Sequence, residues 1–325
     1  MIGVVFKMCA KSTYFYQIYL DLATMKNYTI PSVYLFLITG FITCSCEFFS
    51  PNKDRSDVFE DVPTRVDFPS GRIDEASGLA DSRTIRGYLW VHNDSGNPAE
   101  LFLLSHDGKD LRSYPTPGME NRDWEDISIG PGPTTGVSYV YVADFGNNNA
   151  NPDVTTYTIY RVPELRSLNA GFEASTVETI KYRYPDGPHD AETLLVDPKT
   201  KDIFIVSKDF TGASLYRLPF PQATNEVITA ELAGPVPGVV LATGGDVSAD
   251  GREVIVRTYS NVYYWKRIDK ETIGQMLTQK PLKTLPYQLE PQGEAVSFDA
   301  DMNGYFTLSE KRQGLPVTLN YYKRK

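Results

Sequence analysis

Acidic and hydroxyl side chains recur at the head of five short apolar segments of this chain. The five segments contain Glu75-Ala-Ser77-Gly-Leu79, Asp123-Trp-Glu125-Asp-Ile127, Asp190-Ala-Glu192-Thr-Leu194, Asp246-Val-Ser248 and Glu294-Ala-Val296. Carboxylates that converge on one point repel one another, which raises their pKa values or demands a cation. A hard divalent cation, above all Ca²⁺, accepts about 6–8 oxygen ligands. We therefore expect a calcium site whose ligands are Glu75, Ser77, Glu125, Glu192, Asp246 and Glu294.

The spacing of these segments indicates the elements that position them. They recur roughly every 50 residues, which is the spacing of β-propeller blades. In a propeller the first strand of each blade lines the central channel, and side chains two residues apart on a strand share a face. The repeat therefore predicts a ring of carboxylates and hydroxyls at one mouth of the channel. An alternative is that the same acids accept hydrogen bonds from backbone amides of neighbouring blades and serve only to hold the ring together.

Each unit continues with further strands of β-branched and aromatic residues, separated by turn residues. The pattern predicts an all-β, five-bladed propeller. Six blades are the alternative, if a further unit lies between Glu125 and Asp190. Outer strands are expected near Glu178–Tyr182 and Val227–Ala230, among others. The last unit lacks an outer strand, and Thr64–Phe68 can supply it and close the ring. A surface helix is expected over Lys270–Gln279.

The ends of the second strands lie on the same face as the acid ring, because antiparallel neighbours bring the end of one strand beside the start of the other. Those ends offer Asp94 and Asp144 on the first two blades, and basic residues on the last three. A cationic half-ring beside a metal suits a phosphate or carboxylate ligand. The expected ligand-binding residues are Asp94, Asp144, Lys208, Arg257, Lys311 and Arg312.

The N-terminal region is typical of bacterial export. Residues 25–46 combine Lys26, an apolar run from Tyr34 to Thr43, and cysteines that follow at once. This pattern predicts a lipoprotein signal with Cys46 as the lipidated residue and Cys44 as the alternative. Residues 1–24 are interpreted as a mis-annotated upstream extension, residues 47–63 as a flexible tether and residues 64–325 as the propeller domain. The expected location is the bacterial cell envelope, periplasmic or outer-surface.

Charge and cysteine usage exclude several classes of function. The chain has a formal net charge of −9, and removal of residues 1–46 takes away three lysines but only one aspartate. An acidic surface disfavours nucleic acid as a partner, because the phosphate backbone dominates such binding. No cysteine follows Cys46. A disulfide framework, a thiol nucleophile and a zinc–thiolate site are thus excluded from the mature domain.

From Gly71 onward the chain resembles a group of uncharacterised exported bacterial propeller proteins, through Glu75-Ala-Ser-Gly-Leu79, His92-Asn-Asp-Ser-Gly96, Asp123-Trp-Glu-Asp126 and Tyr184-Pro-Asp-Gly-Pro-His-Asp-Ala-Glu192. A second resemblance is to the calcium-activated nucleotidases (apyrases), five-bladed propellers with a calcium ion in the channel. It rests on Glu75-Ala-Ser77, Asp123-Trp124, His189-Asp190-Ala191 and Gly293-Glu294. This resemblance implies calcium-dependent hydrolysis of nucleoside di- and triphosphates. The third blade lacks the arginine pair of that family and offers only Lys208.

Two functions remain open from the sequence. One is a calcium-dependent phosphohydrolase that takes an anionic small molecule, with the metal polarising a phosphate. The other is a non-catalytic propeller that presents the same face to a protein or glycan at the cell surface. Propellers perform both roles, so the fold alone does not decide. A partner-binding surface would show an exposed apolar or aromatic patch.

Overall fold

The computed structural model describes residues 58–68, 71–312 and 315–325, which belong to the compact unit Asp54–Lys325. The expected extension, the signal segment with Cys46, and the tether up to residue 57 lie outside the described residues. Within the described ranges, no helix is long and apolar enough to cross a membrane.

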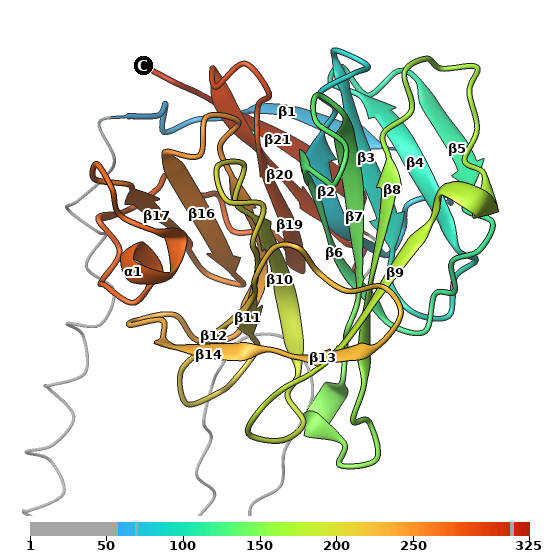
Figure 1. Cartoon of the computed structure of the whole chain (residues 1–325). Coiled ribbons are helices and arrows are strands. Elements are labelled where there is room, and N and C mark those ends of the chain that lie inside the picture. Colours follow the sequence, from blue (N-terminus) through green and yellow to red (C-terminus); the bar gives the residue numbers. More distant parts are fainter. Residues whose placement is uncertain (1–57, 69–70, 313–314) are drawn as a thin grey trace, which may run out of the picture. The chain divides into compact units, whose positions relative to one another are not determined.

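Five sheets form a five-bladed β-propeller (Figure 1). Blade 1 is built from β2 (Ala76–Asp81), β3 (Tyr88–Asn93), β4 (Glu100–Ser105) and β5 (Leu111–Pro115). Blade 2 is built from β6 (Trp124–Pro131), β7 (Ser138–Asp144), β8 (Tyr157–Pro163), β9 (Glu178–Arg183) and β13 (Val227–Thr229). Blade 3 contains β10 (Ala191–Val196), β11 (Ile203–Ser207), β12 (Ser214–Leu218) and β14 (Glu231–Pro235). Blade 4 is built from β15 (Ala242–Val247), β16 (Glu253–Thr258), β17 (Val262–Lys266) and β18 (Lys283–Thr284). Blade 5 is built from β19 (Gly293–Phe298), β20 (Gly304–Ser309), β21 (Val317–Lys323) and β1 (Thr64–Phe68).

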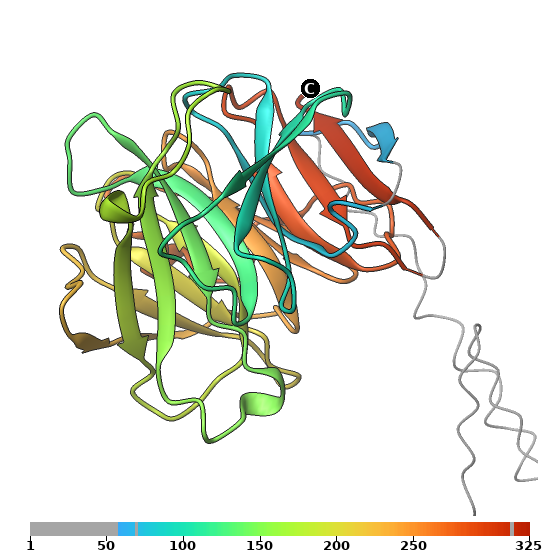
Figure 2. The ribbon, with the colours of Figure 1, turned by 90° about the vertical axis from the view of Figure 1, so that its right-hand side faces the viewer.

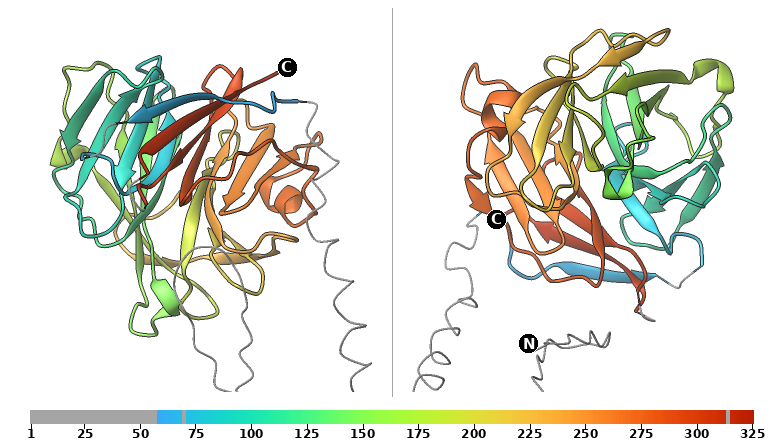
Figure 3. Two further views of the ribbon diagram at one scale, coloured as in Figure 1. Left: turned by 180° about the vertical axis from the view of Figure 1, so that it is seen from behind. Right: turned by 90° about the horizontal axis from the view of Figure 1, so that it is seen from below.

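The inner strands close into a ring. Strands β2, β6, β10, β15 and β19 contact one another in this order, and β19 returns to β2. The right-hand view of Figure 3 looks onto the five sheets from the end that carries the 3₁₀ turn η2 (Asn148–Ala150). The five-blade prediction is confirmed. The six-blade alternative is wrong, because the long stretch before Asp190 supplies a single inner strand, β6.

Apolar side chains between neighbouring blades form the core. One cluster joins blades 2 and 3 through Tyr141, Tyr182, Ile203 and Tyr216, each with no exposed surface. Trp124 is also fully buried, in the cluster between blades 1 and 2. These are the packing positions that β-branched and aromatic residues favour on a pleated, half-buried surface.

The N-terminal segment closes the ring on blade 5. Strand β1 pairs antiparallel with β21, from Thr64 opposite Tyr321 to Phe68 opposite Val317, as predicted. The contact extends further back than expected. Phe59 is completely buried, bridges to Arg324 and packs edge-on against Tyr305 with ring centroids 4.9 Å apart. Residues 58–63 are therefore part of the domain rather than of a free tether.

Replacing Phe59 with alanine should lower the free energy of unfolding by about 3–5 kcal/mol, because a large cavity would open between blades 4 and 5. Urea denaturation of the purified domain measures this loss. The exposed neighbour Val62 provides the control, since Val62→Ala removes no buried contact and should leave the midpoint unchanged. A loss below about 1 kcal/mol for Phe59→Ala would show that the segment only rests on the propeller.

The segment after blade 3 differs from the prediction. Val227–Ala230 was expected to be the outer strand of the third unit, but β13 runs parallel to β9 and extends blade 2, and β14 is the outer strand of blade 3. The chain thus crosses from one blade to its neighbour and covers an open edge that would otherwise invite pairing. The expected helix is shorter than predicted, α1 (Ile273–Leu277), and buries Ile273, Met276 and Leu277 against blades 3 and 4.

Candidate functional site

Each inner strand carries a β-bulge at its second residue, at the same end of the propeller. The bulged residues are Ser77, Glu125, Glu192, Thr243 and Glu294, and we call them the lower ring. A bulge places two residues opposite one and re-aims a side chain. The two hydroxyls bind the neighbouring blade: Ser77 donates to the carbonyl oxygen of Glu125 at 2.9 Å, and Thr243 donates to that of Gly293 at 3.1 Å. Carboxylates therefore occupy three of the five positions.

A second set of residues lies directly after the second strand of each blade, beside the lower ring. This upper ring contains Asp94, Phe145, Lys208, Tyr259 and Glu310. Backbone hydrogen bonds of 2.8 to 2.9 Å hold the amides of Asp94, Lys208 and Glu310 to carbonyl oxygens near the start of each inner strand. We call the carboxylates of Asp94, Asp123, Glu125, Glu192, Glu294 and Glu310 the acidic cup.

Three carboxylates of the cup form the tightest group. Asp94, Asp123 and Glu125 each place an oxygen within 4.8 Å of the other two. Asp144 fixes this geometry from below, because its Oδ1 accepts the amide hydrogen of Asp123 at 2.7 Å. Glycine at position 146 makes room, since a Cβ there would overlap both Oε1 of Glu125 and Oδ2 of Asp123. Residues of blades 1 and 2 thus build a compact oxygen cradle.

Basic side chains balance only part of the negative charge of the cup, because Lys208 pairs with Glu192 and Arg122 lies near Asp123. Burial raises the pKa of Glu125 well above its usual range, and the carboxylates of Glu192 and Asp94 add to the rise. Burial and the charge of Glu294 likewise raise the pKa of Glu192. Burial, together with Glu294 and Asp94, raises the pKa of Glu310 to about 8. The cup consequently favours protons or a cation.

Arg122 lies at the edge of the cup, with its Nη1 4.0 Å from Oδ2 of Asp123, and Lys208 contacts the cup from blade 3. The Nζ of Lys208 donates to Oε1 of Glu192 and lies 5.3 Å from the ring centroid of Tyr259. Burial opposes the ammonium charge, but the carboxylates of Glu192 and Glu294 outweigh burial and raise the pKa of Lys208. Oε2 of Glu294 remains buried and has no hydrogen-bond partner among the described residues. An unpaired buried carboxylate oxygen is costly and points to an additional ligand.

Asp246 does not occupy the position predicted for it. It lies three residues beyond Thr243, and its Oδ2 accepts hydrogen bonds from the Ser297 hydroxyl at 3.0 Å and the Phe298 amide at 2.8 Å. Asp246 therefore joins blade 4 to blade 5, as expected from the alternative in which the acids only hold the ring together. Asp126 does the same between blades 2 and 3, accepting the Leu194 amide at 2.8 Å.

Two further members of the predicted metal set lie at the margin of the cup. Ser77 is in the lower ring, but its hydroxyl is engaged by the neighbouring blade. Glu75 is exposed and accepts a hydrogen bond of 2.6 Å from the Asn97 side chain. The structure thus brings together Glu125, Glu192 and Glu294 from the predicted metal set, and Asp94 and Lys208 from the predicted ligand set.

The predicted cationic half-ring is not formed. Arg257, the penultimate residue of β16, has no exposed surface, because its guanidinium lies between blades 4 and 5 and pairs with Glu290. Lys311 pairs with Asp74 at 2.9 Å, and Arg312 donates to Oε1 of Gln292 at 2.8 Å. Asp144, also predicted to contact a ligand, is buried and supports Asp123.

The predicted ligand sets omitted Asp123, although the acidic repeat contains it, and they omitted Glu310 and Gly146. Thr243 was also missed as the fourth member of the lower ring. One signal could have found Thr243: Ala242-Thr-Gly244 repeats the pattern of Ala76-Ser-Gly78 in blade 1. His189, which carries part of the nucleotidase resemblance, hydrogen-bonds through Nε2 with Asp186 at 3.1 Å and with the Tyr216 hydroxyl at 2.8 Å.

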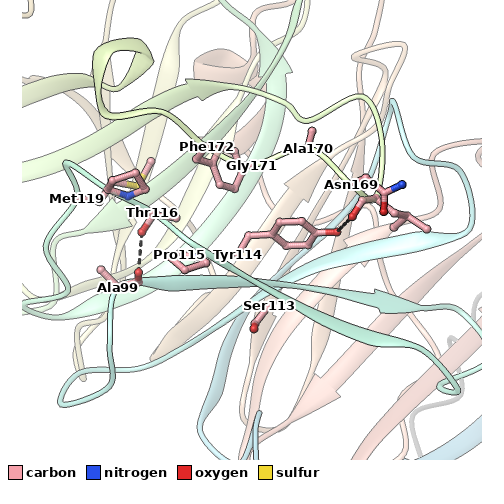
Figure 4. A pocket seen from close by; sticks show the side chains of 12 residues that line it. Ala99, Ser113, Tyr114, Pro115, Thr116, Met119, Asn169, Ala170, Gly171 and Phe172 are labelled. Atoms are coloured by element: carbon pink, nitrogen blue, oxygen red, sulfur yellow. Dashed lines mark hydrogen bonds between the residues drawn. The ribbon is translucent and has the colours of Figure 1, made fainter.

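A groove of about 620 Å³ lies at the periphery, away from the cup (Figure 4). It separates β5 from the loop around Ala170, and the Tyr114 hydroxyl bridges it by donating to the carbonyl oxygen of Leu168 at 2.9 Å. Its lining contains no carboxylate, histidine, cysteine or lysine. The chemistry that the sequence predicts therefore belongs to the cup.

Solved structures with a similar chain trace include two enzymes. A luciferin-regenerating enzyme aligns over 80% of this chain and 95% of its own, with 11% identity and a TM-score of 0.46. A gluconolactonase from Xanthomonas campestris aligns over 77% of this chain and 72% of its own, with 11% identity and a TM-score of 0.42. No protein-family model and no curated protein matches the sequence. The similarities are too weak to bear on the chemistry of the cup.

Proposed function

We propose that this protein is a hydrolase that depends on a divalent cation, with Ca²⁺ held in the acidic cup. The main support for this proposal is the group of Asp94, Asp123 and Glu125, whose oxygens lie within 4.8 Å of one another at the channel mouth. The unpaired Oε2 of Glu294 supports the same proposal from the other side of the cup. Three carboxylates leave several of the about 6–8 oxygen positions of Ca²⁺ free for water and substrate.

A bound cation would polarise a phosphoryl or carbonyl oxygen and orient water. The side chains around it have separate tasks. Lys208 would stabilise developing negative charge, since its Nζ donates to Glu192 of the cup. Burial and the charges of Glu294 and Asp94 raise the pKa of Glu310 to about 8 in the cation-free cup, which makes Glu310 the candidate acid for protonating a leaving group. Phosphate esters and anhydrides are the substrate class to test first, although binding must then rely on the cation and Lys208 rather than on a ring of arginines.

A second candidate function is binding of a partner protein or glycan without catalysis. It is favoured by Phe210, which is 81% exposed in the loop that follows Lys208. Large exposed apolar side chains often mark interaction sites. We also propose, from the sequence pattern, that the domain is anchored to the bacterial cell envelope through Cys46.

Calcium should raise the melting temperature of the purified domain, with a stabilisation of about 2.7 kcal/mol at a hundredfold excess over Kd. Gly146→Ala should weaken calcium binding about 10–100-fold, because the added methyl group displaces the oxygens of Glu125 and Asp123 without removing a charge. Thermal unfolding at increasing calcium concentration measures both effects. Gly171→Ala is the matched control, since a Cβ there meets no atom within 4 Å.

A flat calcium titration of the wild-type domain would overturn the proposal. If Gly146→Ala responded to calcium as strongly as the wild type, the group of Asp94, Asp123 and Glu125 would not be the calcium site. Hydrolysis is tested separately with phosphate monoesters, carboxylic esters and nucleoside triphosphates, with calcium or with a chelator. Calcium binding without turnover of any of them would favour the partner-binding function.

A further inference from the structure

The acidic cup has two halves of different chemistry. The first half is the oxygen cradle of blades 1 and 2, formed by Asp94, Asp123 and Glu125. The second half contains a lysine among acids. Lys208 of blade 3 donates from Nζ to Oε1 of Glu192, and the charge of Glu294 on blade 5 acts on the same ammonium. We call Lys208, Glu192 and Glu294 the lysine half.

The lysine half binds a cation that the chain itself supplies. The side chains of Lys208 and Glu192 are only 14% and 7% exposed, so their charges meet in a largely buried place. Tyr259 of blade 4 lies beside them, with its ring centroid 5.3 Å from Nζ of Lys208. A lysine ammonium is a compact point charge on a flexible stem, and in this respect it resembles a bound metal ion. The acids of this half therefore already hold a positive charge.

The ammonium does not use all the oxygens of the lysine half. Glu294 is 5% exposed, and its Oε2 is buried without a hydrogen-bond partner among the described residues. Leaving a buried acceptor unpaired is costly. A hard divalent cation accepts about 6–8 oxygen ligands and would contact Glu192 and Glu294 together. The lysine half thus has the oxygen donors of a cation site in which a lysine occupies the place of the ion.

The charge of Lys208 also reaches the oxygen cradle. Burial raises the pKa of Asp94 and of Glu125, and the ammonium of Lys208 opposes both rises. A cation in the cradle would therefore have a second positive centre within electrostatic reach. Hydrolytic sites with two metal ions, about 3.5–4 Å apart, use such a pair to stabilise the attacking and the leaving oxygen.

We propose that Lys208 takes the place of a second divalent cation, so that the cup binds one Ca²⁺ in the oxygen cradle and presents an ammonium beside it. This inference rests on the proposed cation-dependent function and deepens it. A metal–ammonium pair suits a substrate group that carries two oxygens on one centre, such as a phosphoryl or carboxyl group, because each positive centre can take one oxygen. Such a site needs neither a second metal ion nor a ring of arginines.

The test counts the calcium ions bound per chain, by equilibrium dialysis at neutral pH. Wild type should bind one ion. Lys208→Met should bind a second, because the lost ammonium leaves Glu192 and Glu294 without a cation. Adding Glu294→Gln to Lys208→Met should return the count to one. Lys201→Met is the matched control and should keep one ion, because Lys201 precedes β11, at the end opposite to Lys208, and donates to the carbonyl oxygen of Gly132 at 2.9 Å.

Lys208→Gln is a second variant with the same expected gain, in case Lys208→Met does not fold without calcium. Two ions on wild type, or no gain in either Lys208 variant, would overturn the inference, and so would a second ion that survives Glu294→Gln. Absence of calcium from wild type would instead contradict the proposed function. The Lys208 variants would still gain an ion in that case if Lys208 holds a cation position, so the two failures are distinguishable.

Discussion

Replacing Arg257 with methionine should lower the free energy of unfolding by about 3–5 kcal/mol, because it leaves a charge buried without its partner. The Arg257 guanidinium donates to Glu290, to the carbonyl oxygens of Ala295 at 2.6 Å and Leu308 at 3.1 Å, and to the Tyr287 hydroxyl at 2.8 Å. These contacts join blade 4 to blade 5. Urea denaturation at pH 7 measures the loss.

Two comparisons test the cause of that loss. Arg312→Met removes an exposed arginine whose hydrogen bond goes to Gln292, and it should change stability by no more than about 0.5 kcal/mol. Adding Glu290→Gln to Arg257→Met removes the unpaired charge and should restore part of the stability. A loss of less than about 1 kcal/mol for Arg257→Met, or no recovery in the double variant, would contradict the buried-pair explanation.

The calcium-free domain should become less stable as the pH rises from about 5 to about 8. Burial and neighbouring carboxylates raise the pKa of Glu310 to about 8 from an ordinary value of 4.5, and those of Glu125 and Glu192 are also raised. In this window the native state binds more protons than the unfolded state, so the free energy of unfolding falls with rising pH. The slope is at most about 1.4 kcal/mol per pH unit for each such group.

Calcium should reverse this trend, because it binds the deprotonated carboxylates and its affinity increases with pH. Denaturation midpoints at several pH values, with calcium or with a chelator, give both curves. Glu310→Gln should flatten the calcium-free curve, whereas the exposed control Glu226→Gln should not. A calcium-free curve that is flat, or that rises between about pH 5 and pH 8, would show that the cup carboxylates are ordinary surface acids.

Most of the fold was predictable from the sequence, because blade architecture depends on local alternation and on turn residues that recur at a fixed spacing. The closing strand Thr64–Phe68 could be inferred from a final unit that was one strand short. The addition of β13 to blade 2 could not, because Val227–Thr229 and Glu231–Pro235 are both short and largely exposed. Nothing in their composition specifies which sheet edge they join.

The site was predictable only in part, because position on a strand decides whether an acid faces the channel. Glu125, Glu192 and Glu294 were found, since each is the second residue of its strand. Asp246 was misassigned because the acid pattern was matched by residue type and not by register, and a shift of one residue turns a side chain to the other face. Arg257 was misassigned because burial between blades leaves no mark in the local sequence.

The N-terminal segment reaches the domain at the end opposite to the cup. Val58 accepts the amide of Lys325 at 2.8 Å beside the end of β21, while the cup lies at the end that carries η2; Figures 1 and 2 show the C-terminus and the green turn of η2 at opposite ends of the propeller. The twelve residues from Glu47 to Val58 span at most about 40 Å when extended. If Cys46 carries a lipid, as we propose, the attachment enters the domain at the end opposite to the cup and leaves the mouth of the cup free of the chain's own anchor.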